Sequence, residues 1–224
     1  MSLPKIKFQL ASDLHLEQGQ FAKNYRNIAV LPDRGCEYLL LAGDIGSVGI
    51  FNHQDAFRQW LISTCQRYKL VFWIGGNNEF KGNSVNYGVG VMRRFAADPR
   101  MHEKLIVLEN DSYDMMKHGY NISILGCVLW TRIRADQPST DKQIKDNNKR
   151  LHNARFEKSL RWIKQQVEAI RREDPKRRIL VMTHHTPTVR GSSRPEFEND
   201  TNKTWSAYQT DILGGGGRSW PSDW

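Results

Sequence analysis

Short apolar runs alternate with longer amphipathic stretches along the whole chain. Apolar runs of a few residues that are rich in β-branched and aromatic side chains predict strands. When such runs alternate with helical stretches, the pattern predicts a layered α/β domain. The expected strands cover residues 6–11, 38–42, 70–74, 105–108, 122–129 and 179–183.

Two amphipathic stretches predict helices, because their apolar side chains recur three and four residues apart. The first lies between the second and third expected strands. The second runs from about residue 153 to 171, and Asp174-Pro175 ends it, since proline has no N–H to continue a helix. The two apolar stripes comprise Phe57, Trp60, Leu61, Thr64, Cys65 and Tyr68, and then Phe156, Leu160, Ile163, Val167 and Ile170.

Three segments show no clear periodicity and are expected to be loops, namely residues 82–90, 135–148 and 191–224. The last is rich in Gly, Ser, Asn and Pro, so we predict an irregular C-terminal segment over 191–224. No linker divides the chain, and 39% of its residues are hydrophobic. We therefore expect one domain over residues 1–224 that buries a core of its own.

The three cysteines, Cys36, Cys65 and Cys127, are far apart and match no zinc-finger spacing. This usage favours reduced thiols, so we expect no disulfides and a cytoplasmic or nuclear location. No segment approaches the ~20 consecutive apolar residues that a membrane span requires, so no membrane partner is expected.

The net charge of +9 favours anionic partners, such as phosphate esters, nucleotides or nucleic acid. Basic residues gather in the stretches 142–150 and 171–178. A solvated helix end explains such runs as readily as a binding surface does. Charge alone therefore does not choose among these partners.

Polar side chains follow four of the expected strands at the point where each strand ends. In an open α/β sheet, ligands collect at the carboxyl ends of the strands, so these clusters are expected to converge. Each cluster alone would equally suit a helix cap or a turn. Together they supply carboxylates, imidazoles and an amide oxygen, which suit a divalent metal ion. The clusters are Ser12-Asp13-Leu14-His15, Gly43-Asp44, Gly76-Asn77-Asn78-Glu79 and Thr183-His184-His185.

The order of these clusters resembles the signature of the calcineurin-like metallophosphoesterases. That signature reads Asp-x-His, then Gly-Asp, then Gly-Asn-His-Asp/Glu, then a strand that ends in His. The resemblance extends from residue 6 to about residue 213. It implies a four-layer α/β/β/α sandwich and hydrolysis of phosphate mono- or diesters.

The resemblance also implies a set of metal ligands. Asp13 and His15 would bind one ion, Asp44 would bridge two ions, and Asn77 with His184 would bind the second. With nitrogen and oxygen donors and no cysteine, manganese, iron or zinc are the expected ions.

A less favoured ligand is His185, the second histidine after the last expected strand.

Two departures from the family pattern bear on activity. Asn78 stands where the family has the His that protonates the leaving alkoxide, and an amide has no proton to give near neutral pH. The family's closing Gly-His-x-His is not found, so we expect a C-terminally truncated version of the fold with weakly bound metal. We expect weak or lost activity, the alternatives being an inactive protein-interaction module or a basic nucleic-acid binder.

Overall fold

The computed structural model describes residues 5–139, 141–189 and 205–212. The chain divides into two compact units. Unit 1 contains residues 1–128, 143–146 and 177–184, and unit 2 contains residues 129–142, 147–176 and 185–224. The expectation that the whole chain is one domain stays a prediction.

Unit 1 contains two sheets. The first sheet is parallel throughout, in the order β1-β2-β3-β4, and the second has the order β5-β6-β7 with β5 antiparallel and β7 parallel to β6. The strands of the first sheet are β1 (Phe8–Ala11), β2 (Tyr38–Ala42), β3 (Leu70–Ile74) and β4 (Leu105–Val107). Those of the second are β5 (Asp111–Asp114), β6 (Ile122–Cys127) and β7 (Arg178–Thr183).

Every residue of β2 and β3 is buried, because both faces of the first sheet are covered. Alternate side chains, such as Leu40 and Phe72, enter a core that also contains Ile124 and Met182 of the second sheet. The opposite face carries Trp73, whose ring meets that of Phe57 edge-on at 5.3 Å. The two sheets therefore pack face to face, and helices cover the outer face of the first.

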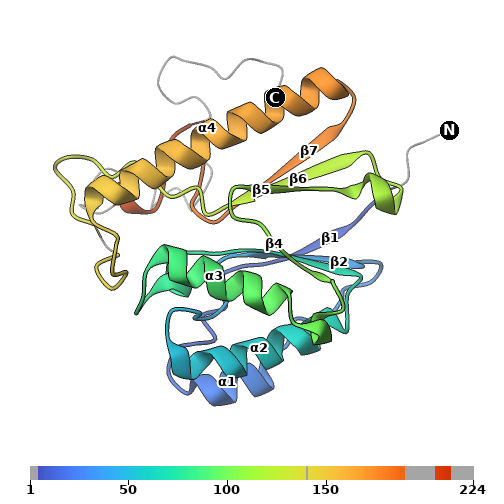
Figure 1. Ribbon diagram of the computed structural model, residues 1–224, viewed down its shortest axis with the longest axis horizontal. Coiled ribbons are helices and arrows are strands. Elements are labelled where there is room, and N and C mark those ends of the chain that lie inside the picture. The colour runs from blue at the N-terminus through green and yellow to red at the C-terminus, as the bar shows by residue number, and fades with distance from the viewer. Residues whose placement is uncertain (1–4, 140, 190–204, 213–224) are drawn as a thin grey trace. The chain divides into compact units, whose positions relative to one another are not determined.

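The helices of unit 1 are α1 (Phe21–Asn27), α2 (Phe51–Cys65) and α3 (Val85–Ala96). They lie on the side of the first sheet that faces away from the second sheet (Figure 1). Unit 2 contributes the long helix α4 (Lys149–Glu173). Single-turn 3₁₀ helices lie at Asn78–Phe80, Pro99–Met101, Met115–His118 and Trp205–Ala207. No helix among the described residues has the length and apolar character needed to cross a bilayer.

The predicted α/β class is confirmed, and the six predicted strands and both predicted helices are present. The pattern missed α1 and β5, which are short and largely polar at the surface. The strand expected to reach residue 129 ends at Cys127. Leu129 and Trp130 have φ of 68° and 60°, a left-handed conformation that does not continue a strand.

The prediction of a loop over residues 82–90 was wrong, because α3 begins at Val85. Two glycines within the helix concealed its periodicity. Ser84 caps the helix by accepting a hydrogen bond from the backbone N–H of Tyr87 at 3.1 Å. A Cβ at Gly88 would lie 2.4 Å from the ring of Phe80, so glycine lets the helix approach that ring.

Most of the predicted irregular segment 191–224 lies outside the described residues. Its described part, 205–212, forms a 3₁₀ turn at Trp205–Ala207 and a bridge from Gln209 to Thr186.

Candidate metal centre

Asp13, His15 and Asp44 lie in the loops that directly follow β1 and β2. All three have positive φ, at 54°, 47° and 52°, a conformation that costs a non-glycine residue about 1–2 kcal/mol. The two loops hold each other in place. The N–H of Asp13 donates to the carbonyl of Gly43, and that of His15 to the carbonyl of Asp44, both at 3.0 Å. Strained backbone that the fold enforces in this way is typical of functional sites.

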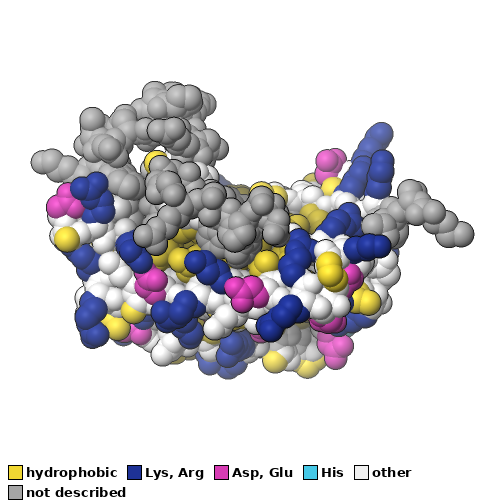
Figure 2. All heavy atoms as spheres, turned by 90° about the horizontal axis from the view of Figure 1, so that it is seen from above, with side chains coloured by type: hydrophobic (Ala, Val, Ile, Leu, Met, Phe, Trp, Pro, Cys, Tyr) yellow, Lys and Arg dark blue, Asp and Glu magenta, His cyan; other side chains and the backbone are white. Residues whose placement is uncertain are grey.

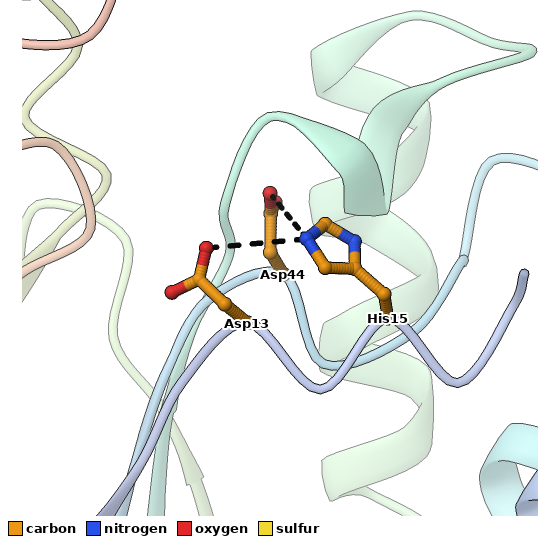
Figure 3. Close-up of side chains that lie close together, drawn as sticks. All are labelled: Asp13, His15 and Asp44. Carbon is orange, nitrogen blue, oxygen red and sulfur yellow. Dashed lines mark ion pairs between the residues drawn. The ribbon is translucent and has the colours of Figure 1, made fainter.

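The side chains of these three residues converge (Figure 3). His15 Nε2 lies 4.0 Å from Asp13 Oδ1 and 3.8 Å from Asp44 Oδ2. Asp44 is buried, whereas Asp13 is exposed and His15 is half-buried. One end of the cluster is thus enclosed by protein and the other faces solvent.

A second imidazole approaches Asp44 from the end of β7. His184 Nε2 lies 3.5 Å from Asp44 Oδ2 and 3.2 Å from Asn77 Oδ1. Its other ring nitrogen, Nδ1, lies 3.0 Å from the carbonyl oxygen of Ala42. A single carboxylate oxygen of Asp44 therefore lies within 4 Å of Nε2 atoms from two histidines.

Asn78 also contacts Asp44. Its backbone N–H donates to Asp44 Oδ1 at 2.8 Å, and its side-chain amide donates to Asp44 Oδ2. The side chain is largely buried, so the amide is held against the carboxylate. An amide in this position supplies a hydrogen bond but no acidic proton.

Glu79 is a buried residue that was not predicted to have a role. Its carboxylate accepts hydrogen bonds from the N–H groups of Asp44 at 2.8 Å, Ile45 at 2.8 Å and Gly76 at 2.7 Å. Burial, and after it the charge of Asp44, raises the pKa of the Glu79 carboxyl well above its usual range. Through these hydrogen bonds, Glu79 links the end of β2 to the end of β3. The sequence feature that could have indicated this role is the acidic side chain of Glu79 at the end of the cluster Gly76-Asn77-Asn78-Glu79.

Glycine is required where the strand ends meet. A Cβ at Gly76 would lie 2.2 Å from Asp44 Oδ1, and one at Gly43 would lie 2.7 Å from His184 Nδ1. Gly43 also has a φ of +88°. Both positions need glycine, because the carboxylate of Asp44 and the ring of His184 lie directly against the backbone there.

A family model for calcineurin-like phosphoesterases matches residues 6–215. The chain belongs to this family. No curated protein matches the chain significantly. Among solved structures, it is similar to phosphopantetheinyl hydrolase from Mycobacterium tuberculosis. That match has a TM-score of 0.49 and 14% identity, and covers 91% of this chain and 75% of that one.

Calcineurin-like phosphoesterases generally bind divalent metal ions, and the donor atoms here suit such ions. Metal–ligand bonds of about 2.0–2.2 Å bring neighbouring donors to roughly 3–3.5 Å from one another. The donor pairs around Asp44 Oδ2 are 3.5 and 3.8 Å apart, and the Asn77–His184 pair is 3.2 Å apart. These spacings lie within that range or slightly above it, and the Asp13–His15 pair is longer, at 4.0 Å.

His185, the less favoured candidate ligand, belongs to unit 2 of this calcineurin-like chain. Its ring stacks on Trp130, with centroids 5.8 Å apart, and lies 6.2 Å from the ring of His152. His152 is itself fully buried, with Nε2 2.9 Å from the Thr131 hydroxyl and Nδ1 3.4 Å from the carboxylate of Asp141. These contacts describe His185 as part of a buried aromatic and polar cluster within its unit.

The two basic stretches lie in different kinds of structure. Residues 142–150 are mostly loop leading into α4, whereas residues 171–178 include the last turn of α4 and the start of β7. Within the second stretch Arg177 is buried and donates to Asp114 at 3.1 Å. On the face that Figure 2 draws, Lys and Arg side chains of the described residues are interspersed with acidic and apolar ones.

Proposed function

We propose that this chain is a divalent-metal-dependent phosphoesterase with weak activity. Asp13 and His15 would hold one ion, Asn77 and His184 a second, and Asp44 would contact both. The observation that carries the proposal is the position of Asp44 Oδ2, 3.8 Å from His15 Nε2 and 3.5 Å from His184 Nε2. A carboxylate that lies between two imidazoles is placed to contact an ion held by each of them.

The substrate class is a phosphate mono- or diester, including nucleotides. When bound, the ions supply Lewis-acid stabilisation of the phosphoryl oxygens and lower the pKa of water. The protein residues position the groups that take part in this chemistry. Glu79 and the glycine turns keep Asp44 in place, and the exposed side of Asp13 leaves the centre open to a substrate.

Asn78 is the reason to expect weak turnover. It occupies the position at which the family signature has a histidine, and its side-chain amide donates a hydrogen bond to Asp44 Oδ2. Loss of a positioned general acid typically costs about 10²–10⁴ in rate. The same residue favours the alternative function, an inactive relative that acts as a protein-interaction module.

Hydrolysis of chromogenic phosphate mono- and diesters with saturating manganese tests the proposal. We expect slow turnover that Asp44→Asn abolishes. Asp55→Asn is the matched control, because Asp55 is an exposed aspartate of α2 that pairs with Arg58. Manganese binding without any turnover would favour the inactive relative. Turnover that survives Asp44→Asn would contradict the proposed centre.

A further inference from the structure

The Nδ1 atoms of the two histidines around Asp44 face different hydrogen-bond acceptors. His184 Nδ1 faces a neutral backbone carbonyl, that of Ala42, at 3.0 Å. His15 Nδ1 instead faces a carboxylate oxygen, Glu17 Oε1, at 3.3 Å. In both cases the partner of Nδ1 is an acceptor, so Nδ1 carries a hydrogen and Nε2 points toward Asp44.

Glu17 is well placed to act on His15. Its side chain is 11% exposed, and the N–H of the preceding residue, the fully buried Leu16, donates to the carbonyl of Ile45 at 3.0 Å. Among the described residues, no Lys or Arg forms an ion pair with Glu17, and its Oε2 has no hydrogen-bond partner. No Lys or Arg among the described residues therefore neutralises this carboxylate, which contacts the His15 imidazole and whose charge also acts on His53 and Tyr25.

The two halves of the centre also differ in charge. The half with Asp13 and His15 contains a carboxylate ligand of its own and an imidazole backed by a second carboxylate. The half with Asn77 and His184 contains a neutral amide and an imidazole backed by a neutral carbonyl. Carboxylate partners fix the tautomer of a ligating histidine and increase its basicity as a ligand.

We propose that Glu17 is a positioning residue that holds His15 as the Nδ1–H tautomer and makes the Asp13–His15 half the tighter of two metal sites. The affinity part of this inference rests on the proposed function. The tautomer part concerns the metal-free protein and stands by itself. Glu17 would thus set an order of loading, with one ion held more firmly than the other.

Long-range ¹H–¹⁵N NMR of the metal-free protein tests the tautomer. In the parent, His15 should show one Nδ1–H form, and Glu17→Ala should convert it to a mixture. Glu17→Gln should retain the parent form, because an amide oxygen still accepts from Nδ1–H. His184 serves as the internal control and should not change. An unchanged His15 tautomer in Glu17→Ala would overturn the orientation role.

Manganese titration against a chromophoric chelator tests the affinity. We expect two classes of site, with Glu17→Ala weakening the tighter about 10–100-fold and leaving the looser unchanged. Glu17→Gln should produce a smaller loss. Glu37→Gln is the matched control, because Glu37 is an exposed glutamate that pairs with Lys69 at 2.8 Å.

Equal losses in Glu17→Ala and Glu37→Gln, or weakening of the looser site instead, would overturn the affinity role. If the parent binds no manganese, the proposed function and the affinity role both fail. The NMR result then decides the orientation role by itself, so the two failures are distinguishable. Circular dichroism shows whether each variant is folded. If Glu17→Ala is unfolded, Glu17→Gln is compared with the parent in its place.

Discussion

The backbone N–H of Asn78 donates to Asp44 Oδ1 at 2.8 Å, so the residue at the family's general-acid position is anchored to the candidate bridging carboxylate. This bond does not depend on the side chain of residue 78. A histidine there would keep the backbone contact and add an ionisable group beside the centre.

Asn78→His should therefore raise kcat on a phosphodiester, measured with saturating manganese. The upper limit is the general-acid factor of ~10²–10⁴, with KM little changed, since proton donation acts in the transition state. Asn52→His, an exposed position of α2, is the control and should change neither constant. A parent that already turns over rapidly would contradict the assignment of weak activity.

Asp44→Asn should change the free energy of unfolding of the metal-free protein by no more than about 2 kcal/mol while removing its stabilisation by manganese. Asp44 is 3% exposed and its charge acts unfavourably on the fully buried Glu79, so neutralising it relieves that interaction. The new amide, however, leaves one of the two Asn78 donors without an acceptor, and the two effects oppose each other. Thermal unfolding with and without manganese measures both effects, since a ligand raises Tm only where it binds the folded state. A fall of more than about 2 kcal/mol in the metal-free free energy of unfolding would contradict this account.

Gly88→Ala and Gly90→Ala, two positions of α3, should change stability in opposite directions. A Cβ at position 88 would lie 2.4 Å from the fully buried ring of Phe80, so overpacking should cost about 1–3 kcal/mol. At position 90 the nearest contact is the end of Arg94 at 3.7 Å. Alanine should stabilise the helix there by roughly 0.5–1 kcal/mol. Denaturant unfolding of both variants measures the contrast, and equal effects would contradict the packing of α3.

Cys65 should be inert to thiol reagents at pH 8, while the half-buried Cys36 reacts. Burial raises the pKa of the Cys65 thiol to about 12, so the folded state holds its proton where the unfolded chain loses it. Its stabilising contribution is thus complete below the unfolded pKa of about 8.5 and is lost as pH rises toward the folded value. The difference in Tm between the parent and Cys65→Ala should shrink from pH 8 to pH 11. A constant difference would contradict the burial of this thiol.

The sequence by itself determined the α/β class, the family and six of the seven strands among the described residues. Strands β2 and β3 are continuous apolar runs because both of their faces are buried, and such runs are visible in sequence. The polar residues directly after these strands could be identified as candidate metal ligands, because they begin where the apolar run stops. Helix α3 was concealed because Gly88 and Gly90 interrupt the periodicity that identifies a helix.

Only the tertiary structure decided how the polar residues meet. Asp44 and His184 are 140 residues apart in the chain, yet their side chains lie 3.5 Å apart because β2 and β7 bring their ends together. The roles of Glu17 and Glu79 also depend on such distances. A carboxylate two residues after a histidine, or one that closes a motif, has no fixed role in sequence. Its function is set by the imidazole or backbone N–H groups that the fold places against it.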